Sequence, residues 1–301
     1  MGWRSVIISH HAKISYSSNC MIVQTIEGIN KIPIDDIYLL LVFTTQAVIT
    51  TELINHLNKV NAKIIFSDEH GNPACELTNN YPNNRNLDII NKQVFWDDGR
   101  KEILWTKIIT RKMLNQISVL DYKNIEGTEE LRSEIDKIEI GDTSNREAVV
   151  ARKYFKLLYD NSFSRRENNE INAALNYGYS ILLSNFNREI VSRGFLTYIG
   201  IHHHSMENAF NLGSDLMEPF RPIIDYWVSS KKFNALTPDV KFGLVEILNM
   251  EIKYNDKSML VKTAISKYVS DCLDYLNTGK SNDLRVELLN EVPNNAINDN
   301  V

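Results

Sequence analysis

The hydrophobic pattern of this chain changes period at one place, and that change restricts its fold more than any other feature. The N-terminal part carries short runs rich in Ile, Val and Tyr, separated by turn-forming residues, as expected for strands. After a polar stretch at residues 77–88, apolar residues recur with helical spacing almost to the C-terminus. We therefore expect an α+β protein, with a small N-terminal β-rich domain (1–83), a larger all-α domain (84–289) and a disordered tail (290–301).

The two parts of the sequence predict different secondary-structure elements. Strands are expected at residues 3–9, 12–17, 20–25, 30–34, 36–43 and 62–68, with a helix at 51–59 capped by Thr50 or Thr51. In the second half, helices are expected at residues 97–119, 144–159, 168–193, from 208 onward, 240–250 and 258–276. Gly194 is expected to end the third of these helices, and the fourth meets Pro219 and Pro222.

Composition and charge are those of a soluble protein. Hydrophobic residues make up 43% and charged residues 24% of the chain. The longest apolar run, residues 37–43, is too short to span a bilayer, and the start lacks the pattern of a signal peptide. The three cysteines are widely spaced without a C-x-x-C pair, which favours reduced thiols. We expect a cytoplasmic protein without a membrane partner.

The net charge of −5 gives no reason by itself to expect nucleic acid, but the charge is unevenly distributed. Residues 92–112 carry six Lys or Arg against three acids, and residues 146–193 carry eight against five. This distribution allows a basic face on a mildly acidic protein, although such runs are commonly ordinary solvated helix faces.

The segment IHHHSMENAFNLGSDLMEPFRPIID, residues 201–225, contains candidate metal ligands. Asp215 and Glu218 are three residues apart, so a helix would place both on one face, although such pairs are common on surfaces. Carboxylates with one imidazole suit Mg²⁺ or Mn²⁺. His202 and His204 would share a face in a strand, which is a zinc-hydrolase arrangement, whereas His203 would point the other way. A plain polar turn after Gly200 accounts equally well for the three histidines.

Glu147, in TSNREAVVARKYF, is a third candidate acid. Ser144 and Glu147 have the spacing of a capping box, in which the glutamate needs no metal. However, Glu147 is the sole acid of its helix, and the next polar positions are basic, as a metal-bound phosphate requires.

Together these blocks resemble a known family, the CRISPR-associated adaptation integrases or universal spacer-acquisition Cas proteins, in their type II branch. The resemblance rests on MGWRSVIISHHAKISY, REAVVARKYF, ALNYGYSILLS and GIHHHSMENAFNLGSDLMEPFRPIID, and it covers nearly the whole chain. It implies a β-rich N-terminal domain that makes dimer and partner contacts, a helical catalytic domain and a homodimer. Two such dimers are expected to bridge a small ferredoxin-fold adaptation partner in a heterohexamer.

The resemblance also assigns the site. It makes Glu147, His203 and Glu218 the catalytic and metal-binding residues for Mg²⁺ or Mn²⁺, with Asp215 in support; Ala148 stands where the family usually has Gly. The implied reaction joins a DNA 3′-hydroxyl to a leader–repeat phosphodiester, so the enzyme is expected to be a DNA integrase and endonuclease, a hydrolase of phosphodiester bonds acting in antiviral defence. Candidate contacts to prespacer and repeat DNA are Arg146, Arg152, Lys153, Tyr154, Arg165, Arg166, Arg188 and Arg193. Tyr177 and Tyr179 are expected to pack at a helix crossing around Gly178 rather than to stack on DNA.

In type II systems the resemblance further implies a ring-shaped DNA-binding accessory protein and the RNA-guided effector nuclease as partners. Two alternatives stay open at this point. One is a zinc hydrolase that uses His202 and His204, and the other is a non-catalytic DNA-binding scaffold of the same complex.

Overall fold

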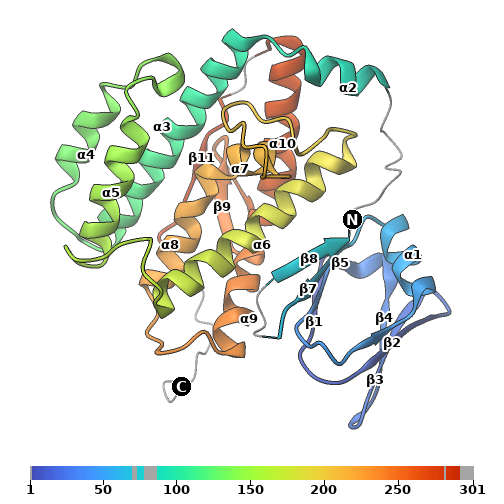
Figure 1. The fold of residues 1–301 in the computed structure, drawn as a ribbon. Coiled ribbons are helices and arrows are strands. Elements are labelled where there is room, and N and C mark those ends of the chain that lie inside the picture. The colour runs from blue at the N-terminus through green and yellow to red at the C-terminus, as the bar shows by residue number, and fades with distance from the viewer. Residues whose placement is uncertain (1, 70–72, 78–86, 281–282, 292–301) are drawn as a thin grey trace. The chain divides into compact units, whose positions relative to one another are not determined.

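A computed structural model of the chain describes residues 2–69, 73–77, 87–280 and 283–291. The chain divides into two compact units, residues 1–82 and 83–301 (Figure 1). The unit order, with strands first and helices second, confirms the α+β fold class. The expected tail, from residue 292 on, lies outside the described residues.

The N-terminal unit contains two four-stranded sheets with one core between them. The first sheet has the order β1-β5-β7-β8 and the second the order β4-β3-β2-β6. The strands are β1 (Arg4–Ile8), β2 (Lys13–Ser17), β3 (Cys20–Thr25), β4 (Gly28–Pro33), β5 (Ile37–Val42), β6 (Val48–Ile49), β7 (Lys63–Ser67) and β8 (Pro73–Leu77). Helix α1 (Thr51–Lys59) contacts β2 and β7, and the Thr50 side chain accepts a hydrogen bond from the amide of Leu53, as an N-cap should. Strand β5 is buried along its whole length, because β1 and β7 flank it on both sides and the core covers it.

The second unit is built around two long helices, α3 (Asp98–Tyr122) and α6 (Glu170–Ser192) (Figure 1). Helix α3 contacts α4, α5, α8 and α10, whereas α6 contacts α7, α8, α9 and α10. The remaining helices are α2 (Leu87–Val94), α4 (Thr128–Ile135), α5 (Arg146–Leu158), α7 (Asn211–Leu216), α8 (Arg221–Ser229), α9 (Pro238–Glu246) and α10 (Val261–Thr278). Short 3₁₀ turns occur at η1 (Ile34–Asp36), η2 (Ile140–Asp142), η3 (Glu218–Phe220) and η4 (Ile247–Asn249).

The expected helix ends and crossings are largely present. Gly194 has a φ of 87° directly after α6, which is the left-handed conformation expected of a C-terminal glycine. At Gly178, a Cβ atom would lie 2.5 Å from the side chain of Ile224, so glycine permits the close crossing of α6 and α8. Tyr177 and Tyr179 are buried beside this crossing, as predicted.

One small sheet inside the helical unit was not expected. Strands β9 (Glu251–Tyr254), β10 (Lys257–Leu260) and β11 (Val286–Glu287) pair in the order β10-β9-β11. The prediction that a helix covers residues 258–260 is therefore wrong, and α10 begins only at Val261. Asn255 and Asp256 both have positive φ and form the two-residue turn of a hairpin, which Asn and Asp tolerate better than other non-glycine residues.

The helix expected from residue 208 is broken into α7, η3 and α8. Pro219 and Pro222 lack the amide protons that a continuous helix needs. The break is held by the core, since Phe220 is fully buried and its ring contacts Phe186 and Tyr268 at centroid distances of 5.2 and 5.3 Å. Glu218 thus starts the 3₁₀ turn at a position fixed by Phe220. No helix in the described part of the chain is long and apolar enough to cross a membrane.

Candidate active site

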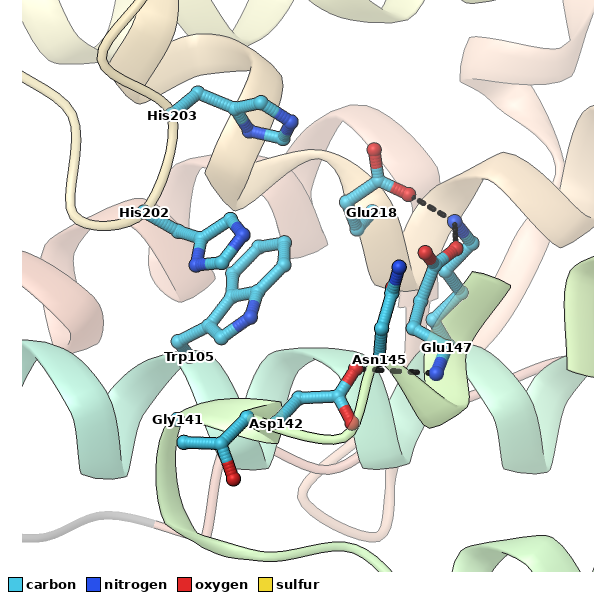
Figure 2. Close-up of a pocket in the computed structure, with 10 residues that line it drawn as sticks. Trp105, Gly141, Asp142, Asn145, Glu147, His202, His203 and Glu218 are labelled. Carbon is cyan, nitrogen blue, oxygen red and sulfur yellow. Dashed lines mark hydrogen bonds and ion pairs between the residues drawn. The ribbon is translucent and has the colours of Figure 1, made fainter. Parts of the chain in front are cut away.

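A cavity of about 480 Å³ in the helical unit brings the predicted ligands together (Figure 2). Its lining comes from α3, from the η2–α5 connection, from the loop after α6 and from η3. The lining residues are Trp105, Lys112, Gly141, Asp142, Thr143, Asn145, Glu147, His202, His203 and Glu218. All three predicted metal ligands are among them, although they are separated by up to 71 positions in the chain.

Glu218 is a buried carboxylate between two cations. Its Oε2 lies 2.5 Å from Nζ of Lys112, and its Oε1 lies 3.0 Å from Nε of Arg221. Burial alone would raise the pKa of Glu218, but the positive charges of Arg221 and Lys112 outweigh it and hold this pKa below its ordinary value. Glu218 is therefore ionised at neutral pH.

Glu147 faces Glu218 from the first turn of α5. Its Oε1 is hydrogen-bonded to the same Lys112 ammonium, which joins the two glutamates (Figure 2). The side chain of Glu147 is 23% exposed, against 8% for Glu218. Glu147 is therefore the more open of the two acids toward the cavity.

The interpretation of Glu147 as half of a capping box is wrong. The residue before α5 is Asn145, in the left-handed conformation and without a side-chain cap. Asp142 caps the helix from three residues further back: its Oδ1 accepts from the amide of Arg146 at 2.7 Å and its Oδ2 from the amide of Glu147 at 3.1 Å. The Glu147 side chain is thereby left free to face the cavity.

His203 is oriented by Asp215. Nδ1 of His203 lies 2.5 Å from Oδ1 of Asp215, and this hydrogen bond is the main cause that raises the pKa of His203. The Asp215 carboxylate also accepts hydrogen bonds from the backbone amides of Ile201, His202 and His203, with nitrogen–oxygen distances of 2.7, 3.0 and 3.2 Å. Asp215 is fully buried, and a Cβ atom at Gly200 would come within 2.7 Å of it. Asp215 is thus a support that fixes the loop and the ring, and Nε2 of His203 is the nitrogen left for a ligand.

His202 takes a different position from His203. Its ring stacks on Trp105 at a centroid distance of 4.1 Å with an interplanar angle of 5°, and burial lowers its pKa (Figure 2). His203 meets the same indole edge-on at 5.8 Å. His204 is exposed and does not line the cavity. The three histidines therefore have three separate environments.

Among the described residues, no three His, Cys, Asp or Glu side chains are gathered closely enough to form a finished metal site. Between Glu147 and Glu218 the structure places the ammonium of Lys112. Two carboxylates and an imidazole nitrogen nevertheless have the chemistry that Mg²⁺ or Mn²⁺ prefers, and the two carboxylates already share one cation. The donor set of this cavity thus fits such an ion.

The candidate DNA contacts fall into two groups. Arg152 and Arg166 are exposed, whereas several others are held by acids or amides of the protein. Lys153 pairs with Glu130 at 2.7 Å. The other held side chains are Arg146 with Glu134 at 3.1 Å, Arg165 with Asn176 at 2.7 Å, Arg188 with Glu189, and Arg193 with Glu189 at 2.6 Å. Tyr154 is fully buried, so the expectation that it contacts DNA is wrong for this fold.

Lys112, Trp105 and Asp142 are among the cavity residues that sequence reasoning missed. The sequence does contain an indication of Lys112. This lysine lies four residues after Ile108 on the buried face of α3, where a charged side chain requires a partner. Asp142 could not be found in this way, because its role depends on a left-handed backbone at φ 52° in the connection before α5.

The sequence is similar to those of known proteins along most of its length. The sequence model of a family described as CRISPR associated protein Cas1 matches residues 5–235. The chain is 32% identical over 276 residues to the CRISPR-associated endonuclease Cas1 of Neisseria meningitidis serogroup C (strain 8013), covering 90% of this chain and 91% of that protein.

Two solved structures share the fold. A casposase bound to integration product superposes with a TM-score of 0.73 at 20% identity, covering 93% of this chain and 92% of that one. A chain of a Cas6-RT-Cas1–Cas2 complex gives a TM-score of 0.70 at 17% identity, covering 96% of this chain and 36% of that one. Together with the family match, which spans more than half of the chain, these similarities confirm the resemblance seen in the sequence: the chain belongs to the Cas1 family of CRISPR-associated proteins.

Proposed function

We propose that this chain is a divalent-metal-dependent DNA integrase and endonuclease that inserts new spacer DNA into a CRISPR array. The observation that carries the proposal is the convergence of Glu147, Glu218 and His203 on one cavity, from three distant segments (Figure 2). The names of the relatives point the same way, since the Neisseria meningitidis protein is named an endonuclease.

Glu147, Glu218 and Nε2 of His203 would hold Mg²⁺ or Mn²⁺. When bound, such an ion supplies Lewis-acid chemistry, which favours ionisation of an attacking DNA 3′-hydroxyl and offsets charge that develops on a phosphodiester. The two carboxylates supply negative charge, and the cations Arg221 and Lys112 hold the pKa of Glu218 below its ordinary value.

The protein's own residues then position the site. Asp215 keeps Nδ1 of His203 protonated and fixes the plane of the ring, so Nε2 presents its lone pair to the cavity. Trp105 supports the His202 ring and forms part of the cavity wall. Asp142 fixes the first turn of α5 and with it the direction of Glu147.

DNA is the substrate that this proposal requires, and exposed Arg152 and Arg166 are its first candidate contacts. The casposase neighbour is bound to an integration product, and another neighbour is a complex that contains Cas1 and Cas2. We accordingly propose that this chain acts as a homodimer on double-stranded prespacer and repeat DNA, in a heterohexamer with a ferredoxin-fold adaptation partner. The proposal places it in the cytoplasm of a type II system, together with the ring-shaped accessory protein and the effector nuclease.

A joining assay tests the proposal. Full-length protein with a labelled DNA end and a leader–repeat duplex is incubated with Mn²⁺, Mg²⁺ or EDTA, and the joined strand is measured on a denaturing gel. We expect joining only with a divalent ion, and a loss of at least about 100-fold in Glu147→Gln, His203→Ala and Glu218→Gln with melting temperatures that show a folded protein. Joining in EDTA, or full joining by Glu218→Gln, would refute the three-ligand site.

A scaffold without catalysis would bind both DNAs and join neither. A zinc hydrolase would require His202 and His204, whereas the stacking of His202 on Trp105 favours a supporting position for that ring. If His202→Ala and His204→Ala abolish joining and His203→Ala does not, the ligand assignment is wrong.

A further inference from the structure

Lys112 occupies the point where the two catalytic glutamates meet. Its Nζ contacts Oε1 of Glu147 and lies 2.5 Å from Oε2 of Glu218. The residue is 9% exposed, and it projects from the buried face of α3 between Ile108 and Gln116. Three residues further along, Nδ2 of Asn115 donates to the carbonyl of Pro219 at 2.8 Å, which ties α3 to the turn that carries Glu218. The lysine is therefore held in place by its own helix.

The charges around this point balance. Glu147 and Glu218 carry two negative charges, and Lys112 and Arg221 carry two positive charges in contact with them. Two adjacent carboxylates without such cations would be costly, because buried Glu218 has lost hydration and the two negative charges repel each other. Lys112 is thus the group that allows two glutamates to lie together when no metal is bound.

The same position makes Lys112 a competitor of a metal ion. An ion ligated by a carboxylate oxygen lies about 2.1 Å from it. An ammonium 2.5 Å from that same oxygen would then lie within about 5 Å of the ion, where like charges repel. The lysine and a metal ion would therefore compete for the Glu147–Glu218 pair in the present geometry.

We propose that Lys112 is the resident counter-ion of the metal site: it positions Glu147 and Glu218 in the metal-free protein and is displaced from them when a divalent ion binds. This inference rests on the proposed function, because it takes Glu147 and Glu218 as metal ligands. Lys112 is here a positioning residue, and its charge sets the affinity of the site for the ion.

The sign of a change in metal affinity tests the inference. Mn²⁺ binding to EDTA-treated full-length protein is measured by electron paramagnetic resonance of the free ion, for the unchanged protein and for Lys112→Met. The counter-ion role predicts that Lys112→Met binds Mn²⁺ more tightly, by about tenfold (~1.4 kcal/mol), because the ion no longer displaces a cation. The metal-free variant melts at a lower temperature, and Mn²⁺ raises its melting temperature by more than that of the unchanged protein.

Two further variants keep the test decisive. Lys112→Gln removes the charge but retains hydrogen-bonding groups, and it also predicts tighter Mn²⁺ binding, so it replaces Lys112→Met if that variant does not fold. Lys241→Met removes another buried lysine, in α9, which contacts the ring of Tyr177 and does not line the cavity. It should change stability without changing Mn²⁺ affinity.

Unchanged or weaker Mn²⁺ binding in folded Lys112→Met or Lys112→Gln overturns the inference, because a merely structural lysine would loosen the ligands when removed. A failure of the proposed function would give different binding results from a failure of this inference. The unchanged protein would then bind no Mn²⁺, or Glu147→Gln and Glu218→Gln would bind it as well as the unchanged protein does.

Discussion

The carboxylate of buried Asp215 lies 2.5 Å from Nδ1 of His203 and accepts the backbone amides of Ile201, His202 and His203. One side chain thus fixes both the loop and the imidazole that the loop presents. This pair gives the acid three residues before Glu218 a positioning role that does not require it to be a ligand.

Asp215→Asn is the first variant to examine. An amide places an NH₂ group where backbone amides now donate, so we expect the free energy of unfolding to fall by at least about 2 kcal/mol. Loss of the carboxylate–histidine contact should lower Mn²⁺ affinity and DNA joining by about 10–100-fold. Glu207→Gln removes an exposed acid from the same loop and should change neither quantity. Normal joining by Asp215→Asn would show that His203 needs no such support.

Asp142 should affect activity through the direction of Glu147. Asp142→Ala removes the acceptor for the amides of Arg146 and Glu147, which should cost about 1–2 kcal/mol of unfolding free energy, as lost helix caps do. Asn169→Ala is the matched control, because Asn169 caps α6 through the amide of Asn172. We expect similar losses of stability in urea denaturation, but reduced joining only in Asp142→Ala. Equal DNA joining by both variants would show that Asp142 does not influence the joining reaction.

Arg152 and Arg166 should contribute to DNA binding without contributing to chemistry. Arg152→Ala and Arg166→Ala should each weaken binding of prespacer DNA irrespective of its sequence. Each should also reduce the magnitude of the slope of the logarithm of the DNA association constant against the logarithm of salt concentration by about one. Lys153→Ala is the comparison, since Lys153 pairs with Glu130 and Glu134. A salt slope that falls in Lys153→Ala and not in the arginine variants would place the DNA against Lys153 instead of against Arg152 and Arg166.

A buried acid in the helical core gives a pH dependence of stability. Asp225 accepts a hydrogen bond from Tyr179, and burial raises its pKa to about 6 from 3.8. The folded protein therefore holds the proton of the Asp225 carboxyl more tightly than the unfolded chain does. The contribution of protonated Asp225 to the free energy of unfolding is greatest below about pH 4 and is lost as pH rises through about 6. The two pKa values differ by about two pH units, which corresponds to about 3 kcal/mol.

The comparison with Asp225→Asn measures this contribution. Urea denaturation in EDTA between pH 4 and pH 7.5 should show the unchanged protein losing stability relative to Asp225→Asn as pH rises. A constant difference between the two proteins over this range would mean that Asp225 is ionised throughout.

Local patterns predicted most elements of the fold. The strand runs of the first unit and the amphipathic helices of the second were placed correctly because each pattern is set by which face is buried. The hairpin at Tyr254–Lys257 was missed, although Asn255-Asp256 is a turn signal, because the apolar spacing of α10 extends backward over β10.

The site was predictable only in part. His203, Glu218 and Glu147 were chosen through family resemblance, since the residues alone left three histidines and a capping box as alternatives. Lys112 and Asp142 act through contacts between segments about 30 or more residues apart, or through one left-handed backbone position. Neither kind of information is visible as a periodic pattern.

The central claim is that Glu147, His203 and Glu218 are the ligands of one catalytic metal site. Its most direct measurement is the anomalous difference density of Mn²⁺ in crystals of the unchanged protein. The account predicts density bounded by the carboxylates of Glu147 and Glu218 and by Nε2 of His203, with Asp215 still hydrogen-bonded to Nδ1. Density centred on His202 and His204, or on Asp215 itself, would contradict it.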